Sequence, residues 1–169
     1  ILRENELFAK ESKCSFGQSS IGYLGHIVSK EGVRADPDKL RAMEQWPLPK
    51  DPRGLRGFLG LTGYYRRFIH GYGSIASPLT KMLKKGEFAW TEQSRAAFQR
   101  LKEVMLAAPV LTLPDFTQDF VIETDASDVG VGAVLSQFGH PIAFMSKAIT
   151  SRAKPLSTYE KELFAIVLS

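Results

Sequence analysis

The sequence predicts an α+β fold, with a short β-hairpin first, then several helices, and finally a β-β-β-α unit. Apolar residues recur at helical spacing through residues 52–69 and again through residues 92–108. Three β-rich runs follow between residues 118 and 147, and a capping sequence at Ser157 starts a last helix. The chain has 169 residues, of which 44% are hydrophobic, so it can form one ordinary domain or two small ones around a core.

The first expected elements are strands, followed by two capped helices. Residues 19–28 carry the aromatic and β-branched side chains typical of a strand, and residues 29–32 predict a turn into a second short strand. Asp36 and Asp51 are each followed by proline. An aspartate caps the first N–H groups of a helix, and a proline at the first helical position loses no hydrogen bond, so each pair predicts a helix start.

The helix predicted over residues 52–69 has an apolar stripe and a second face that carries glycine. The stripe consists of Leu55, Phe58, Leu59, Thr62, Tyr65 and Ile69. The second face consists of Arg56, Gly60, Gly63, Tyr64 and Arg67. A glycine inside a helix costs roughly 1 kcal/mol relative to alanine. Two explanations for the glycines stay open, namely close approach of a ligand to the backbone and packing of another helix against small residues.

The later helices and strands are predicted from helix caps and hydrophobic periodicity in the same way. Residues 75–85 predict a short helix, and Thr91 predicts the cap of an amphipathic helix that Pro109 ends. Its inward residues are Ala97, Phe98, Leu101, Met105 and Ala108. The three expected strands are residues 118–125, 129–137 and 140–147. Ser157 and Glu160 then form a capping box.

Charge and cysteine content bound the possible partners. The net charge is +4, with 15 Lys/Arg and 9 Asp/Glu in residues 1–90 against 7 and 9 in residues 91–169. A basic first half favours a polyanionic partner, although a solvated surface without a partner explains it equally well. Cys14 is the single cysteine and fits a reducing compartment, and no apolar run reaches the roughly 18 residues of a membrane span. Because the first residue is Ile rather than Met, we expect an excised or incomplete chain.

Two carboxylates stand where a metal site could form. Asp125 ends the first strand of the β-β-β-α unit, and Glu162 lies about one turn into its helix. If the helix packs across the sheet, the two side chains can converge, and carboxylates that repel each other are commonly held by a divalent cation. Two Mg²⁺ ions in such a clamp activate water for phosphodiester cleavage. The alternative is two unrelated carboxylates, because glutamate is favoured near a helix N-terminus in any case.

Several motifs resemble one known family. The segments FVIETDASDVGVGAVLSQ, PIAFMSKAIT and STYEKELFAIV resemble the start of the RNase H domain of gypsy-class LTR retrotransposon polyproteins. The earlier segments LFAKESKCSF, YLGHIVSKEGVRADPDKLRAMEQWPLPKDPRGLRGFLGLTGYYRRFI and SPLTKMLKKGEFAWTEQSRAAFQRLKEVMLAAPVL resemble the reverse transcriptase of the same family. The resemblance implies a palm end with a primer-grip-like hairpin at residues 1–35, a helical thumb at 36–90, a connecting helix at 91–114 and a truncated N-terminal part of an RNase H-like domain at 115–169.

The resemblance also implies roles for particular residues. The nucleic-acid-binding residues would be Tyr23, Leu24, Gly25 and His26 of the primer grip, with Arg56, Gly60, Tyr64 and Arg67 of the thumb. Asp125 and Glu162 match the first catalytic aspartate and the catalytic glutamate of RNase H, where they are ligands of Mg²⁺, with Mn²⁺ as a substitute. The Tyr-x-Asp-Asp hairpin of the polymerase and the later RNase H aspartates are absent from the sequence, so the metal would bind only in a completed site.

Three functions are compatible with this sequence. The first is an enzyme part that grips a template–primer duplex or an RNA–DNA hybrid and carries part of the two-metal site. The second is a binding module without chemistry, and the third is an inactive remnant. The expected partners are nucleic acid and the remaining segments of the Pol polyprotein, with no membrane. The resemblance implies an intracellular location, in a cytoplasmic virus-like particle or the nucleus.

Overall fold

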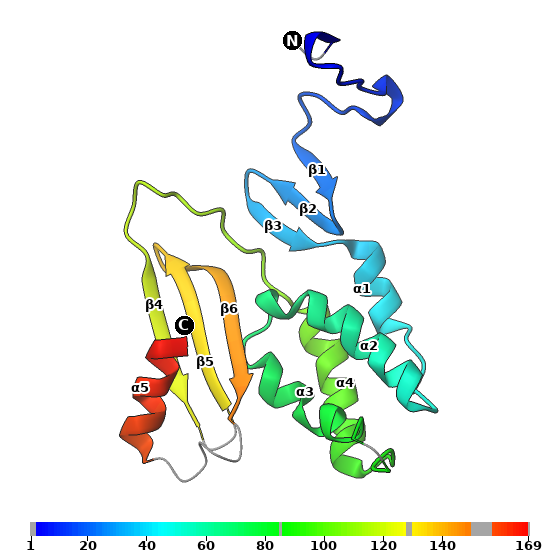
Figure 1. Ribbon diagram of the computed structural model, residues 1–169, viewed down its shortest axis with the longest axis vertical. Coiled ribbons are helices and arrows are strands. Elements are labelled where there is room, and N and C mark those ends of the chain that lie inside the picture. The colour runs from blue at the N-terminus through cyan, green and yellow to red at the C-terminus, as the bar shows by residue number, and fades with distance from the viewer. Residues whose placement is uncertain (1–2, 85, 128–129, 150–156, 169) are drawn as a thin grey trace.

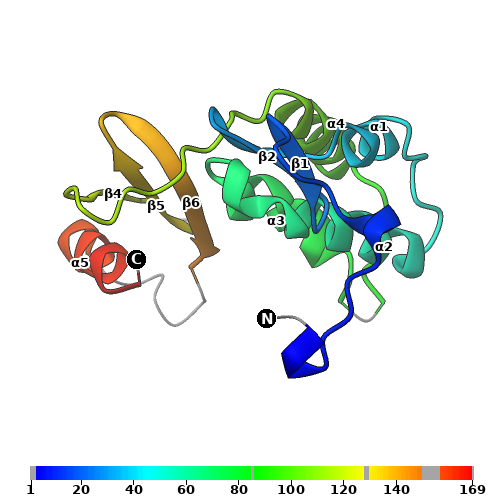
Figure 2. The ribbon, with the colours of Figure 1, turned by 90° about the horizontal axis from the view of Figure 1, so that it is seen from above.

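The computed structural model describes residues 3–84, 86–127, 130–149 and 157–168. It contains a small N-terminal sheet, a group of four helices, and a second sheet with one helix packed on it (Figure 1). Seen from above, the second sheet and its helix lie beside the helical group (Figure 2). This arrangement confirms the predicted α+β class and its order of elements. Among the described residues, no helix is long and apolar enough to cross a membrane.

The first sheet is an antiparallel meander. Its strands are β1 (Ser20–Tyr23), β2 (His26–Ser29) and β3 (Gly32–Ala35). The single strand predicted over residues 19–28 is therefore wrong, because a two-residue turn at Leu24 and Gly25 divides it. Both turn residues have positive φ, 48° and 74°, which defines a type I′ turn. The usual sequence signal for such a turn is Asn-Gly. Here leucine, which rarely adopts this conformation, takes the place of the asparagine, so the sequence gives no turn signal.

Four helices form the central group. They are α1 (Pro37–Glu44), α2 (Pro52–Tyr64), α3 (Tyr72–Lys81) and α4 (Glu92–Leu106). The predicted aspartate caps are confirmed, since Asp36 accepts from the N–H of Asp38 at 2.8 Å and Asp51 from that of Gly54 at 2.7 Å. Thr91 and Ser94 form a capping box at the start of α4.

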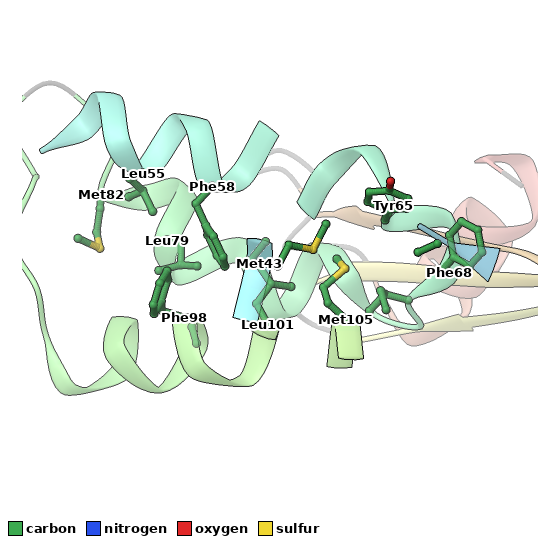
Figure 3. Packing of buried hydrophobic residues seen from close by; sticks show 14 of the residues in the cluster. Met43, Leu55, Phe58, Tyr65, Phe68, Leu79, Met82, Phe98, Leu101 and Met105 are labelled. Atoms are coloured by element: carbon green, nitrogen blue, oxygen red, sulfur yellow. The ribbon is translucent and has the colours of Figure 1, made fainter. Parts of the chain in front are cut away.

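The helix predicted to run to residue 69 ends at Tyr64 instead. Arg66–Phe68 form a short 3₁₀ helix, η3, a tightening that is common at helix C-termini. The apolar stripe is nevertheless buried as predicted, because η3 turns Phe68 and Ile69 into the same core. Figure 3 shows this core, to which Leu55 and Phe58 of α2, Leu79 of α3 and Phe98 of α4 contribute.

The second sheet has the predicted β-β-β-α order. Its elements are β4 (Val121–Ala126), β5 (Gly130–Gln137), β6 (His140–Ala148) and α5 (Thr158–Leu168). The strands are antiparallel in the order β4-β5-β6, and the capping box at Ser157 is confirmed by a 2.8 Å hydrogen bond from its N–H to Glu160. Within the described residues, β4 pairs only with β5, and Val121 and Ile122 are 52% and 55% exposed. The unit therefore presents an open apolar edge.

A second type I′ turn joins β5 to β6. Phe138 and Gly139 have φ values of 51° and 74°, so this turn repeats the pairing of a large apolar residue with glycine that is seen at Leu24 and Gly25. Phe138 is 75% exposed. The strain of a non-glycine residue at positive φ, roughly 1 kcal/mol or more, is therefore not offset by burial of the ring.

The segment that follows α4 links the two sheets. Leu111 pairs with Val33 through two hydrogen bonds of 2.8 Å, and Thr112 donates to the carbonyl of Pro141 at 2.8 Å. Gly32 permits this approach, since a Cβ there would lie 2.1 Å from the carbonyl oxygen of Leu111. The first sheet, the connecting segment and β6 thus form one continuous set of backbone contacts.

Candidate nucleic-acid interface and carboxylate pair

The turn between β1 and β2 is held by two consecutive tyrosines from the end of α2. Tyr64 donates its hydroxyl to the carbonyl of Leu24 at 2.5 Å, and Tyr65 donates to the carbonyl of Gly25 at 2.6 Å. Tyr23 and Leu24 point to solvent and are 64% and 70% exposed. The turn is therefore fixed from behind by the helix, while its own side chains stay available to a partner.

His26 is half-buried and packs against three aromatic rings. Its ring centroid is 5.3 Å from that of Tyr64, 5.4 Å from that of Tyr65 and 5.6 Å from that of Phe68. Its Nδ1 is 3.0 Å from the carbonyl oxygen of Leu24. A carbonyl oxygen only accepts, so this contact assigns the proton to Nδ1. His26 therefore helps to hold the turn.

Four glycines lie in α2, and the three that follow its first turn, Gly57, Gly60 and Gly63, have different surroundings. A Cβ on Gly57 would lie 3.3 Å from Cζ2 of Trp46, and a Cβ on Gly63 would lie 3.4 Å from the hydroxyl of Tyr72. A Cβ on Gly60 would meet no atom of the described chain within 4 Å. Gly57 and Gly63 thus make room for aromatic neighbours. Gly60 alone leaves bare helix backbone facing open space.

Two exposed arginines lie on α2 and on the short 3₁₀ helix that follows it. Arg56 lies on α2 one turn before Gly60, whereas Arg67 lies beyond the helix in η3. Arg67 lines a cleft of about 580 Å³ between η3 and the second sheet. The charged residues that line the cleft are Arg66, Arg67 and Lys147, all basic. The positive charge expected from the composition therefore continues from α2 toward β6.

The two carboxylates lie on elements that pack together. Asp125 is exposed on β4, where it pairs with Gly132 of β5, and Glu162 is half-buried on α5, which packs against β4. Packing of the helix on this strand confirms the predicted arrangement of the elements. The described residues contain no group of three or more His, Cys, Asp or Glu that could hold a metal ion. Two carboxylate ligands fit the oxygen preference of Mg²⁺ but fall short of its near-octahedral set.

Lys161, which precedes Glu162 on α5, has a burial that the sequence did not predict. It is 8% exposed on the side of α5 that also buries Ala165. Lysine is rarely buried to this extent, and no pattern in the sequence distinguishes it from a surface lysine. Its position brings a positive charge onto the helix next to Glu162.

Comparison with known proteins identifies the family to which the chain is similar. The RNase H-like domain found in reverse transcriptase matches residues 90–169. The Pol polyprotein of Drosophila melanogaster transposon 297 is 44% identical over 168 residues, which is 98% of this chain and 16% of the polyprotein. An uncharacterized mitochondrial protein of Arabidopsis thaliana is 54% identical over 123 residues, 72% of this chain and 78% of that protein. The chain belongs to the retrotransposon Pol polyproteins. The resemblance identified from the motifs is thereby confirmed.

This Pol segment spans about a sixth of the length of the polyproteins that it matches, since the transposon gypsy relative, 41% identical, is also covered to 16%. A solved structure has the same fold, with a TM-score of 0.85 and 20% identity over 93% of this chain and 22% of that chain. It is the foamy viral protease-reverse transcriptase in complex with an RNA/DNA hybrid. The same protein in complex with double-stranded DNA gives a TM-score of 0.82 over 89% of this chain and 33% of that chain.

The junction between the helices and the RNase H-like sheet of this Pol segment was also not predicted. A Cβ on Gly73 would lie 3.3 Å from Oγ of Ser146, and a Cβ on Gly130 would lie 3.2 Å from Oγ of Ser74. The ring of His70 meets Phe144 edge-on, with centroids 5.9 Å apart. Small residues far apart in the sequence thus let α3 approach β5 and β6 closely. A local sequence pattern cannot predict such a contact.

Proposed function

We propose that this Pol segment grips a template–primer duplex or an RNA–DNA hybrid and supplies the first two carboxylates of an RNase H site. The observation that carries the proposal is the bare backbone of Gly60, which lies on α2 between the exposed side chains of Arg56 and Tyr64. Bare backbone lets a sugar approach, and arginines contact phosphates without reading sequence. A shallow minor groove recognised by its shape suits such a surface.

The β1–β2 turn acts as the primer grip in this proposal. Tyr23, Leu24, Gly25 and His26 form it, and the exposed side chains of Tyr23 and Leu24 are the ones available for contact. The basic cleft at Arg67 continues the path of the duplex toward β6. The complexes named for the structurally similar foamy viral enzyme, one with an RNA/DNA hybrid and one with double-stranded DNA, support this choice of partner.

The proposed assignment of regions along the chain follows the family resemblance. Residues 1–35 end the palm, residues 36–90 form the thumb, residues 91–114 connect, and residues 115–169 begin the RNase H-like domain. In this division α2 and η3 belong to the thumb, and β4 and α5 carry Asp125 and Glu162. The remaining segments of the Pol polyprotein are the partners that would complete both sites.

Asp125 and Glu162 would hold Mg²⁺, or Mn²⁺ in its place, once further carboxylates complete the ligand set. The ion, when bound, supplies activation of water against the RNA strand. The contribution of this chain is to place the two carboxylates on a strand and a helix that pack together. We expect the chain alone to bind a hybrid without cleaving it.

Binding and cleavage of one labelled hybrid test the proposal. Fluorescence anisotropy between about 50 and 200 mM salt should show log K falling linearly with log salt, with a slope of roughly −0.9 per phosphate contact on a duplex. A flat response would exclude the phosphate-contact surface. Cleavage in Mg²⁺ or Mn²⁺ that is lost in Asp125→Asn would show that this chain is itself a nuclease. Absence of cleavage with intact binding favours the alternative of a catalytically inactive nucleic-acid-binding remnant, unless the remaining Pol segments restore cleavage.

A further inference from the structure

We infer that Tyr64 and Tyr65 are positioning residues whose hydroxyl groups lock the β1–β2 turn to α2, so that the turn and the helix act on nucleic acid as one rigid unit. The inference rests on the proposed function, because it assigns the turn and α2 to the same duplex. In that proposal Tyr64 contacts nucleic acid. Here its hydroxyl acts through the turn.

The hydrogen bonds to the turn are the first support. Its two carbonyl oxygens each accept twice, Leu24 from Tyr64 at 2.5 Å and from His26 at 3.0 Å. Gly25 accepts from Tyr65 at 2.6 Å and from the N–H of Asp36 at 3.2 Å. A carbonyl oxygen has two lone pairs, so both oxygens use their full capacity. A surface turn needs none of these partners, because water would satisfy its carbonyls.

The two tyrosines anchor the turn at different depths. Tyr65 is 1% exposed and belongs to the core of the helical group, whereas Tyr64 is half exposed at the end of α2. Their rings meet edge-on with centroids 5.0 Å apart. The turn is therefore connected both to the core and to the helix surface on which Gly60 lies. A rotation of α2 would carry the turn with it.

Gly25 gives the clearance for this contact. A Cβ at this position would lie 3.0 Å from the hydroxyl oxygen of Tyr65 and 3.8 Å from Cε1 of Tyr64. Leu24 has no such reason to be where it is, because it is exposed and has a positive φ that leucine rarely adopts. Phe138 has the same conformation in the other type I′ turn, to which no tyrosine hydroxyl of the described residues is bound, so the positive φ of Leu24 follows from the turn type, and the tyrosine hydroxyls add a connection to α2.

The test begins with the turn itself, in the absence of nucleic acid. The variant Tyr64→Phe/Tyr65→Phe keeps both rings and removes only the hydroxyls. We expect amide hydrogen exchange at His26, which pairs with Tyr23, and at Asp36, whose N–H donates to the carbonyl of Gly25, to accelerate at least about tenfold, because local opening loses two hydrogen bonds. Tyr72→Phe is the matched control, since that hydroxyl bonds to Thr62 and not to the turn. Unchanged exchange in the double variant would overturn the inference whether or not the chain binds a hybrid.

A double-mutant cycle then tests the action on nucleic acid. We expect the double variant to bind a labelled hybrid about threefold to tenfold more weakly, with an unchanged salt slope, because no phosphate contact is removed. In a Tyr23→Ala/Leu24→Ala background the same change should have no further effect, since the hydroxyls act through the turn. An equal loss in both backgrounds, or a shallower salt slope, would show direct contact with the duplex and overturn the inference.

The outcomes separate this inference from the proposed function. If the wild-type chain shows no salt-sensitive binding, the proposed function fails, and the exchange experiment alone decides whether the tyrosines hold the turn. If the wild-type chain binds and the double variant binds equally well, the proposed function stands and the positioning role is wrong.

Discussion

The Oγ of Ser146 accepts a 2.7 Å hydrogen bond from the backbone N–H of Gly73, so a residue of β6 caps helix α3 from another part of the chain. The N-cap residue of α3 is Gly71, which has no side chain to offer. The first N–H groups of a helix have no intrahelical partner, and a serine side chain normally satisfies one of them from the N-cap itself. Here the cap and the contact between the helices and the second sheet are the same interaction.

Replacement of Ser146 by alanine should therefore lower the free energy of unfolding by about 1 kcal/mol, because the N–H of Gly73 loses its acceptor at a partly buried site. Urea denaturation monitored by circular dichroism measures this change. Ser20→Ala, at an exposed position of β1, is the control and should change stability by less than about 0.5 kcal/mol. Equal effects of the two substitutions would show that the remote cap contributes nothing.

Gly60 and Gly57 allow a matched test of the nucleic-acid surface. Gly60→Ala should stabilise α2 by up to about 1 kcal/mol, since its new methyl group meets open space, yet weaken hybrid binding by filling the bare surface. Gly57→Ala should leave hybrid affinity unchanged and gain less stability, because its methyl group would press on Trp46. Thermal unfolding and anisotropy titration measure the two effects. Normal binding by the Gly60 variant would remove this face of α2 from the interface.

The two type I′ turns provide another matched pair. Asparagine tolerates positive φ better than leucine or phenylalanine, so Leu24→Asn and Phe138→Asn should each raise the free energy of unfolding by roughly 0.5–1 kcal/mol. Only Leu24→Asn should weaken hybrid binding, because Phe138 lies in the other sheet. Denaturation and binding are measured on the same samples. Equal affinities of the two variants would mean that the side chain of Leu24 does not touch the duplex.

The pKa of Tyr65 predicts a loss of stability in alkali. Burial raises this pKa to about 12, with the Asp36 carboxylate and Tyr64 as further causes. A raised pKa stabilises the protonated form in the fold, so the stabilisation is complete below the ordinary tyrosine pKa of about 10 and is lost as the pH rises toward 12. Denaturation midpoints measured across this interval should fall more steeply for the wild type than for Tyr65→Phe. Parallel curves would contradict the prediction.

Arg56 and Arg67 are expected to contact phosphates. Alanine at either position should weaken hybrid binding irrespective of sequence and reduce the steepness of the salt dependence by about one unit. Arg100→Ala is the control, because this exposed arginine lies on α4 and pairs with Glu103. An unchanged salt slope in the Arg56 and Arg67 variants would mean that neither arginine contacts a phosphate and that both are simply solvated.

Local rules predicted much of the fold. The caps at Asp36, Asp51, Thr91 and Ser157 and the buried stripe of α2 follow from spacing and side-chain chemistry, so they could be read from the sequence. The order of the second sheet followed from its short β-rich runs. The turn at Leu24 was missed because a leucine at positive φ leaves no local signal.

The candidate site was predictable as a set of residues but not as a set of contacts. The glycines of α2 could be recognised, yet only the structure separates Gly57, which faces Trp46, from Gly60, which faces open space. The burial of Lys161 and the cap from Ser146 depend on tertiary packing between elements that are not neighbours in the sequence. Periodicity describes one element at a time, so it cannot report such pairs.

The two antiparallel meanders also have a kinetic consequence. Each hairpin closes between neighbouring residues, whereas Tyr65 contacts Gly25 across 40 positions and Gly73 contacts Ser146 across 73. Loop closure becomes more costly with length, so the hairpins should form within microseconds and the contacts between units should form last. During translation the β1–β2 turn leaves the ribosome before the tyrosines that hold it. Until Tyr64 and Tyr65 follow, the turn lacks its two hydrogen bonds to α2.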